Sequence, residues 1–549
     1  MVKGQWCIRR AGAGTQGMGR RVIGVLAAIA MVSLVLPLWA GPATSAVAAT
    51  GEPAQPPMKH GGSMTVLEVG ASEGADPQGL DPATNANGGA NQDYMDAIYG
   101  ALFQLNAAGK PVPDLATGYK FLDGMKTVEI FIRHGVKFSD GTPFNAAAVA
   151  AGWTREFQLK VANDPPWPIT KTNPFTTAGP YTAVIHMSIP YSPIINSLFD
   201  KAPNWIESPT ALKREGAKQF PLAPVGAGPY VVTKNVLSTE LRLRRNPLYW
   251  QKGRPYLDTL IFKTVNSDQS ALEALRSGQA QAYTDMTTMQ LVPTFKSAGL
   301  TVDTNPGTSP TCMQLNTTQA PFNNILAREA VTYATNTPLL DKELNHNQGP
   351  PVQGFTAPHG LFYYPRVPGY RTYNLAKAKA LVKRLGGLSF TLLSATSGPM
   401  LNFDEALQTL WRQAGMKVTL EPSTLPQILQ SFSANKWNAV GCGGSWDPAT
   451  GVGQNDRFLS NAPFTGVHDK HLDMLLNKAT EVPNNQRDAL YRQVARYEAK
   501  MAYVIEFYPV NNWDVATKGV SAPGLTIWHP TVIVAPEVWW QDAGYTQSS

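Results

Sequence analysis

Residues 388–442 alternate between short apolar runs and amphipathic segments, and this alternation constrains the fold more than any other feature of the chain. Three of the runs have the length of strands, and the two segments between them have the length of helices. The strands are expected at 388–393, 416–421 and 437–440, and the helices at 402–414 and 425–434. Strands that alternate with helices at this spacing predict parallel βαβ units, so the expected fold class is α/β.

A further helix is expected at 375–385, with Asn374 as its N-cap and Gly386 beyond its end. In open parallel sheets, ligands bind outside the carboxyl ends of the strands. The segment after the last predicted strand has the sequence GCGGSWDP, at 441–448. We therefore expect a ligand there, with Trp446 lining the pocket, because large amphipathic rings commonly line such sites. The alternative is that Trp446 only anchors the loop.

Two strands are expected earlier in the chain. The first, at 64–69, is a short apolar run that leads into residues 70–91, which are rich in Gly, Asp, Asn and Pro and predict a long loop of the kind that often binds ligands. The second lies within 126–137, where branched apolar residues occupy every other position from Val128 to Ile132. A turn at 139–143 and a helix at 146–157 are expected to follow.

The length and charge of the chain limit its function classes. Its 549 residues are enough for two or three lobes, each with its own core. The formal net charge is +7, but the first 48 residues contribute +5 of it, from five basic residues and no acid. The remaining residues carry 41 basic against 39 acidic side chains, with no basic run. We therefore expect no nucleic-acid binding, which needs a basic surface.

Residues 1–48 are typical of a secretory signal peptide. Arg20 and Arg21 precede an uncharged apolar stretch at 22–39, and the small residues 46–48 provide a cleavage site. The alternative is an uncleaved anchor helix, because a stretch of about 18 residues is near the lower limit for spanning a bilayer. Residues 49–61 are rich in Pro and Gly and are expected to form a flexible leader.

Common catalytic motifs are absent from the sequence. It contains no G-x-S-x-G elbow, no H-E-x-x-H motif and no phosphate-binding G-x-x-x-x-G-K-[ST] loop. His468 and His471 form a close pair beside Asp469 and Asp473, but two ligands without a second cluster make a poor metal site, so an exposed helix start is favoured. We expect no enzymatic activity, no cofactor and no metal.

Five segments carry a family resemblance. The most specific is VEIFIRHGVKFSDGTPFNAAAVA at 128–150, which is similar to an R-x-G-V-x-F-x-D-G-T-P block. The others are PVGAGPY at 224–230, RRNPLYWQKGRPYLDTLIFK at 244–263, ALRSGQAQA at 274–282 and LNTTQAPFNNILAREAVTYATN at 315–336. In this order they resemble the solute-binding protein family 5 of ABC importers, the peptide- and nickel-binding proteins of bacteria. The resemblance runs from about residue 62 to the C-terminus.

The resemblance implies a two-lobed periplasmic-binding-protein type II fold with an additional small subdomain, of the cluster C type. Lobe 1 is expected at 62–95, 206–312 and 513–549, its subdomain at 96–205, and lobe 2 at 313–512. The predicted βαβ region falls inside lobe 2. The matching blocks themselves are expected to be structural, with 140–142 in a turn and 226–229 at the start of a strand.

The resemblance also implies a function. It is that of an exported receptor that captures a peptide or peptide-like solute between two lobes, closes on it by a hinge, and delivers it to the permease subunits of an ABC importer. The receptor is expected to be a monomer in the periplasm or cell envelope of a bacterium. It has no lipobox cysteine, since Cys7 precedes the apolar stretch. The alternative is a cell-envelope accessory or regulatory protein that keeps the fold without transport.

The expected ligand-binding residues are scattered over loops and strand ends. They are Gly443, Gly444, Ser445, Trp446, Asp447, Thr311, Met313 and Asn85. The resemblance further implies a disulfide between Cys312 and Cys442, because relatives pair a cysteine just before the strand-end Asp-Pro motif with one near the crossover between lobes. The alternative is two buried free thiols.

A departure from the family pattern bears on specificity. Peptide-binding relatives often hold the α-ammonium of the ligand with an aspartate three residues before the acidic residue of an Asp-Pro or Glu-Pro pair, which corresponds here to Asp447-Pro448. The matching position is Gly444, which would leave that ammonium unpaired and costly to desolvate. We therefore expect ligands that are blocked, cyclic, longer or not peptides, held by aromatic faces such as Trp446 and by backbone amides of 443–445. The alternative is that Asp447 reaches the same point as the missing aspartate, although its place before Pro448 suits a structural turn.

Overall fold

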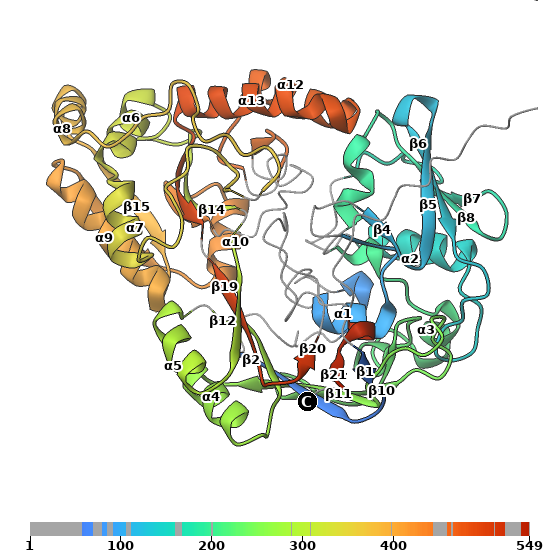
Figure 1. Cartoon of the computed structure of the whole chain (residues 1–549). Coiled ribbons are helices and arrows are strands. Elements are labelled where there is room, and N and C mark those ends of the chain that lie inside the picture. Colours follow the sequence, from blue (N-terminus) through green and yellow to red (C-terminus); the bar gives the residue numbers. More distant parts are fainter. Residues whose placement is uncertain are drawn as a thin grey trace, which may run out of the picture. The chain divides into compact units, whose positions relative to one another are not determined.

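Three β-sheets of four or more strands organise the part of the chain that the structure describes (Figure 1). The computed structural model describes residues 57–69, 80–84, 92–105, 111–159, 167–198, 201–286, 288–307, 309–358, 360–396, 398–442, 458–462, 465–509, 511–521 and 540–547. All of them belong to one compact unit, 55–549. None of the helices formed by these residues has the length and apolar character needed to cross a membrane.

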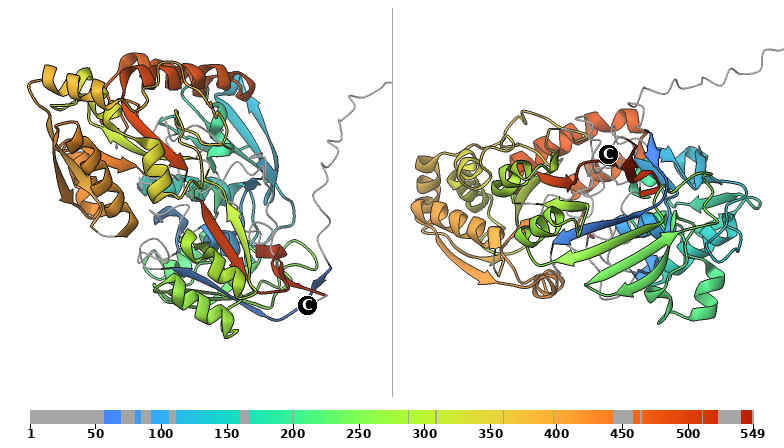
Figure 2. Two further views of the ribbon diagram at one scale, coloured as in Figure 1. Left: turned by 60° about the vertical axis from the view of Figure 1, so that its left-hand side comes forward. Right: turned by 60° about the horizontal axis from the view of Figure 1, so that its bottom comes forward.

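The seven-stranded sheet combines strands from distant parts of the sequence. Its strands are β2 (Ser63–Val69), β9 (Tyr230–Val236), β10 (Glu240–Arg245), β11 (Thr259–Val265), β12 (Ala282–Met286), β13 (Thr301–Asn305) and β19 (Asn512–Ala516). Their order across the sheet is β13-β19-β12-β2-β11-β10-β9. β2 pairs in parallel with β11 and β12, and the other pairs are antiparallel. Figure 2 shows the blue strand β2 lying beside green strands that come much later in the sequence.

Helices cover both faces of this sheet. Met64 and Val66 of β2 pack with residues of α1 (Gln92–Tyr99), whereas Leu67 packs with residues of α4 (Asp268–Arg276) and α5 (Val292–Ser297). Successive side chains of a strand point to opposite faces, so a strand buried on both faces is mainly apolar, and the polar positions of β2 are Ser63, Thr65 and Glu68. The predicted strand at 64–69 is thereby confirmed as β2.

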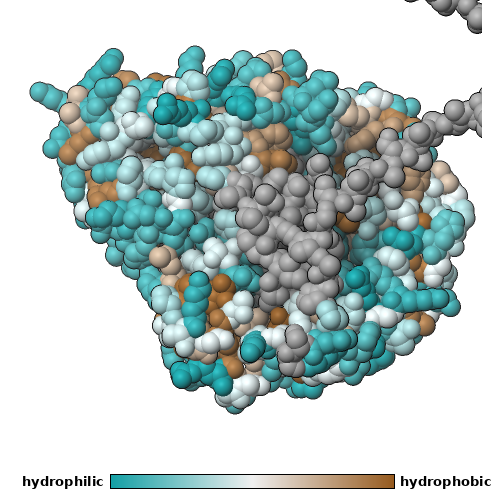
Figure 3. Space-filling view, in the orientation of Figure 1, coloured by the Kyte–Doolittle hydropathy of each residue, from teal (hydrophilic) through white to brown (hydrophobic). Residues whose placement is uncertain are grey.

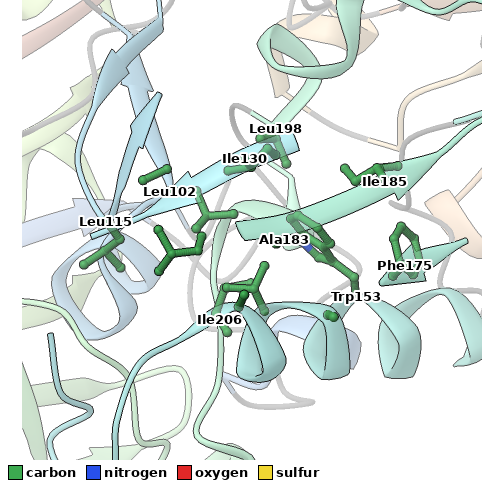
Figure 4. Packing of buried hydrophobic residues seen from close by; sticks show 14 of the residues in the cluster. Leu102, Leu115, Ile130, Trp153, Phe175, Ala183, Ile185, Leu198 and Ile206 are labelled. Atoms are coloured by element: carbon green, nitrogen blue, oxygen red, sulfur yellow. The ribbon is translucent and has the colours of Figure 1, made fainter. Parts of the chain in front are cut away.

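The four-stranded sheet is antiparallel and packs against one long helix. Its strands are β5 (Ala116–Leu122), β6 (Thr127–Ile132), β7 (Phe175–Thr177) and β8 (Thr182–His186), in the order β5-β6-β8-β7. Every second residue of β6 from Val128 to Ile132 is buried, which confirms the predicted alternation. Figure 4 shows Trp153 of α2 (Ala146–Leu159) in the core beneath this sheet, where its ring lies 5.6 Å from that of Phe175.

Residues 139–143 form the predicted turn between this sheet and α2. Gly141 has a φ of +87°, a conformation that favours glycine, and the backbone N–H of Thr142 donates to Oδ1 of Asp140 at 2.9 Å. Two other glycines are required by close approach. A Cβ on Gly226 would lie 2.4 Å from the carbonyl oxygen of Ile98, and one on Gly228 would lie 2.6 Å from a backbone nitrogen. As predicted, these glycines lead directly into β9.

The five-stranded sheet contains the predicted βαβ units. Its strands are β14 (Pro310–Leu315), β15 (Ser389–Ser394), β16 (Lys417–Pro422), β17 (Ala439–Cys442) and β18 (Val504–Pro509), in the order β16-β15-β17-β14-β18. β15 pairs in parallel with β16 and β17, and the helices α9 (Gly398–Gln413) and α10 (Leu425–Ser433) connect these strands. The predicted α/β class is therefore confirmed. β14 is antiparallel to both of its neighbours.

The prediction for the last of these parallel strands was wrong by two residues, because β17 begins at Ala439 rather than at 437. Asn435 has a left-handed φ of +49°, which turns the chain after α10. Trp437 then packs edge-on against Phe432, with ring centroids 4.8 Å apart. The Trp437 side chain is therefore buried in an apolar cluster with residues of α10, and β17 starts two residues after it.

Helices cover both faces of the five-stranded sheet. One face packs against α6 (Ile325–Ala334), α7 (Thr337–Leu344), α8 (Leu375–Arg384) and α9, and the other against α12 (Lys470–Glu481) and α13 (Asn484–Met501). α8 starts as predicted, with the Asn374 side chain accepting from the backbone N–H of Lys377 at 2.9 Å. Asp469 caps the start of α12, as favoured for the histidine pair beside it.

Shorter elements complete the described chain. They are the strands β1 (Met58–Lys59), β20 (Val520–Ser521) and β21 (Gly544–Thr546) in one sheet, β3 (Phe103–Leu105) and β4 (Pro111–Pro113) in another, and the helix α3 (Pro209–Glu215). Of the predicted loop at 70–91, the structure describes residues 80–84, and α1 begins at Gln92, directly after the predicted loop. Residues 80–84 contain a short 3-10 turn, Pro82–Thr84, rather than wholly irregular chain.

Candidate ligand-binding site

Two short connections join the seven-stranded and five-stranded sheets. Residues 306–309 lead from β13 to β14, and residues 510–511 lead back from β18 to β19. All described strands of the five-stranded sheet lie between these two points in the sequence. The predicted lobe boundaries, 312/313 and 512/513, fall inside β14 and β19, so the change of sheet occurs slightly before each of them. A pair of adjacent short connections is the arrangement expected of a hinge.

The two connections are bonded to each other. The backbone N–H of Gly307 donates to Oδ1 of Asn511 at 3.1 Å. Just before this point Asn305 donates through Nδ2 to Oδ2 of Asp514 at 2.6 Å, and both side chains are buried. Just after it, Pro310 of β14 is paired in register with Pro509 of β18. The two segments that cross between the sheets are therefore hydrogen-bonded to each other before, at and after the connections.

Two further polar contacts lie near these connections. Gln290, next to α5, has its Nε2 atom 2.7 Å from Nε2 of His346, which follows α7. Asn345 donates through Nδ2 to the carbonyl oxygen of Pro509 at 3.4 Å. The Gln290–His346 contact joins the two sheet regions, so it is expected to change if the sheets rotate about the connections. The contact of the buried Asn345 lies within the region of the five-stranded sheet, at the end of β18.

The carboxyl ends of the parallel strands form the edge at which a ligand is expected. β15 has β16 on one side and β17 on the other, so the strand order reverses at β15, and such a switch point leaves a crevice outside the strand ends. At this edge the backbone N–H of Ala395 donates to Oδ2 of Asp404 at 3.1 Å. Oγ of Ser394 and Oδ1 of Asp404 are buried and have no hydrogen-bond partner in the described chain. Burial raises the pKa of Asp404 to about 6, and the Ala395 N–H opposes that rise.

A disulfide lies beside this edge. Cys312 of β14 and Cys442 of β17 are paired in register and joined by a disulfide, with a Cα–Cα distance of 4.9 Å. The bond links the crossing strand β14 to the residue after which the predicted glycine-rich loop begins. The pairing implied by the family resemblance is therefore present in the structure.

Two buried carboxyl groups lie near the disulfide. Glu506 of β18 is paired in register with Cys312, so the two side chains share a face of the sheet. Glu498 of α13 covers the same face, and burial, with a further contribution from the charge of Glu506, raises its pKa well above the usual range. Neither these carboxyl groups nor Asp404 is among the residues predicted from the sequence, although a glutamate inside the apolar run VIEFYP of β18 is a visible signal.

The predicted site residues have different outcomes. Thr311 is half-buried in β14 and donates through its hydroxyl to the carbonyl oxygen of Tyr508 at 3.2 Å. Met313 is fully buried in the apolar cluster beneath α6 and α9, so its side chain offers no surface to a ligand in this structure. The remaining predicted residues lie outside the described chain. These are Gly443, Gly444, Ser445, Trp446, Asp447 and Asn85.

The sequence of this chain matches the model of one known protein family. Residues 110–466, more than half of the chain, match the family described as bacterial extracellular solute-binding proteins, family 5 Middle. This chain is a family 5 bacterial extracellular solute-binding protein. The resemblance found in the sequence is thereby confirmed.

Relatives of this family 5 protein include the glutathione-binding proteins GsiB of Shigella flexneri serotype 5b (strain 8401) and of Salmonella typhi. Each is 31% identical to the chain over 342 residues, which is 61% of this chain. The matched stretch covers 65% of the length of each relative, slightly less than two thirds.

Solved structures share the fold of this family 5 protein over most of its length. A dipeptide-binding protein from Pseudoalteromonas sp. SM9913 in complex with Met-Leu has a TM-score of 0.74 and 16% identity, and covers 88% of this chain and 100% of its own. The oligopeptide-binding protein AppA of Bacillus subtilis, in complex with a nonapeptide, has a TM-score of 0.72 and 18% identity, with coverage of 89% and 99%. AgaA of A. tumefaciens R10, in complex with agropinic acid, has a TM-score of 0.73 and 21% identity, with coverage of 88% and 99%. The predicted two-lobed fold of the cluster C type is confirmed by these likenesses.

Proposed function

We propose that this protein is the substrate-binding protein of an ABC importer and that it captures a peptide or peptide-like solute between two lobes. The observation that carries the proposal is the family match over 110–466, on a chain whose two large sheets are joined by a pair of short connections. Such a joint allows closure about the solute, as a shift of population driven by contacts that form only in the closed state.

The proposed lobes follow from the sheets. The seven-stranded sheet belongs to lobe 1, the four-stranded sheet to its subdomain at 96–205, and the five-stranded sheet to lobe 2. We place the solute at the carboxyl edge of β15, beside the disulfide that holds the start of the 443–447 segment to β14. The permease subunits of the importer are the proposed partners, and residues 1–48 are the proposed export signal.

Two observations support the proposed ligand class: the ligands of the relatives, and the glycine at position 444. The named relatives bind glutathione, and proteins of the same fold have been solved with a dipeptide, a nonapeptide and agropinic acid. Gly444 provides no carboxylate for the α-ammonium of an ordinary peptide. Glutathione joins its first residue through the γ-carboxyl, so its ammonium lies elsewhere than in an ordinary tripeptide. A γ-linked, blocked or cyclic peptide-like solute therefore suits this chain better than a free tripeptide.

Isothermal titration calorimetry tests the proposal. The mature protein is unfolded and refolded to remove bound solute and is then titrated with glutathione, a random tripeptide pool and the same pool after N-acetylation. We expect saturable one-to-one binding of glutathione or of the acetylated pool. Tight binding of the free pool that disappears on acetylation would show an ammonium anchor and contradict the role given to Gly444. No saturable heat with any of the three would contradict the proposed ligand class.

A further inference from the structure

An open hollow on the surface beside α13 has three arginines among its lining residues, Arg366, Arg492 and Arg496. Arg366 comes from the segment between α7 and α8, and the other two come from α13. None of these elements contains a residue expected at the ligand-binding site. Figure 3 shows that the surface over α13, at the top of the view, is mainly hydrophilic.

Arg366 is held on a rigid segment. It stands one residue after Pro365 and two before Pro368, and each proline ring fixes its own φ. Tyr364 and Val367 on either side of it are buried in the apolar cluster under α13, and the backbone N–H of Val367 donates to Oε1 of Gln353 at 3.0 Å. The backbone is thus fixed on both sides of an exposed guanidinium group.

Arg492 is also positioned before any ligand arrives. Its Nε donates to Oδ2 of Asp488 at 2.8 Å, and its guanidinium carbon lies 4.4 Å from the centre of the Tyr364 ring. The Tyr364 hydroxyl in turn donates to the backbone oxygen of Asp488 at 3.0 Å. These contacts use Nε and one face of the group, and in the described chain its two terminal nitrogens have no protein partner.

The charge of this cluster is not balanced. Arg496 follows Arg492 by one helical turn and therefore lies on the same side of α13. Among the described residues, Asp488 is the one acid that forms an ion pair with any of the three arginines. Three positive charges and one negative charge leave a net +2 at a single hollow, which equals the net charge of the whole chain after residue 48.

We propose that Arg366, Arg492 and Arg496 form a binding site for a phosphate group. A guanidinium group presents its N–H donors in a planar fork that matches two oxygens of a phosphate, and several forks around one hollow suit an anion with several oxygens. The phosphate group is either free inorganic phosphate or the headgroup of an anionic lipid in the envelope. The site acts independently of solute capture.

Two matched double variants of the full mature protein test this site. R366Q/R496Q removes two exposed arginines that make no described contact, so the fold is expected to remain intact, whereas Arg492 is left in place because it packs on Tyr364. The control R276Q/R384Q removes two exposed arginines from α4 and α8, which also make no described contact. Sodium phosphate at pH 7.5 is titrated calorimetrically at constant ionic strength, and flotation is measured with vesicles of phosphatidylglycerol and of phosphatidylcholine.

We expect the wild-type protein and the control to bind phosphate, and R366Q/R496Q to bind it at least about tenfold more weakly, because each charge-assisted contact contributes about that factor or more. Flotation with phosphatidylglycerol alone, lost in R366Q/R496Q, would assign the phosphate group to a lipid headgroup. The site would be refuted by wild-type protein that binds neither probe, or by equal binding in R366Q/R496Q. Equal loss in both double variants would also refute it, since that would indicate a general charge effect.

Discussion

Asp404 is a carboxyl group held in an apolar setting at the end of β15, where its one described hydrogen bond comes from the backbone N–H of Ala395. Its pKa in the folded protein is about 6, against 3.8 for an ordinary aspartate. The folded state therefore keeps a proton that the unfolded state releases between pH 4 and 6. The free energy of unfolding is therefore highest below pH 4. It falls by up to about 3 kcal/mol as the pH rises from 4 through 6.

Replacement of Asp404 by Asn should remove this loss, because an amide oxygen can still accept from the Ala395 N–H and never ionises. The expected result is that the free energy of unfolding of Asp404→Asn, relative to wild type, rises by about 1–3 kcal/mol between pH 4 and 7. Urea unfolding at several pH values measures it, with Glu405→Gln on the exposed side of α9 as the control. A difference that does not change with pH would show that Asp404 titrates normally.

Gly228 must be a glycine because neighbouring backbone atoms leave no room for a side chain. A Cβ there would lie 2.6 Å from the backbone nitrogen of Gly100, and the backbone cannot retreat as a side chain can. Gly228→Ala should therefore lower the free energy of unfolding by about 1–3 kcal/mol or more. Gly354→Ala, whose Cβ would meet its nearest neighbour at an ordinary 3.5 Å, should have a much smaller effect in the same urea unfolding experiment. Equal losses in both would mean that the approach at Gly228 is relaxed in solution.

At the scale of strands and helices, the sequence predicted what depends on local periodicity. The units from β15 to β17 and helix α8 lie close to where apolar spacing and capping residues placed them. The two departures are α9, which begins at Gly398 rather than at the predicted 402, and β17, which is shifted by the packing of Trp437. The antiparallel pairing of β14 between β17 and β18 was not predictable, because these partners are far apart in sequence and no local pattern specifies them. The proximity of Glu506 and Glu498 was not predictable either, because it depends on that pairing.

The disulfide joins two strands that the sequence alone could not pair. Closing a loop of 130 residues contributes about 4–5 kcal/mol on the chain-entropy estimate, so reduction should lower the stability of lobe 2 by a similar order. We expect the denatured, unreduced mature protein to contain no titratable thiol, and guanidinium unfolding to shift to lower denaturant after reduction. Two thiols per chain in the unreduced protein would show that Cys312 and Cys442 are free in solution.

At the scale of the whole molecule, the family match and the paired connections together support the account of a receptor that closes on its solute. The sequence predicts that Trp446 lines the site, so it is the expected reporter of closure. Titration with glutathione should change the tryptophan emission of the wild-type protein and change it much less in Trp446→Phe. Equal changes in both proteins would place Trp446 away from the solute.

Native mass spectrometry of the mature protein, purified without unfolding from its own host, shows whether the protein carries a bound solute. We expect a one-to-one complex with a small solute, released on denaturation and identified by fragmentation as a peptide or a peptide-like compound. The contradicting result is protein of the bare mass throughout, with no complex formed when glutathione, tripeptides or N-acetylated tripeptides are added.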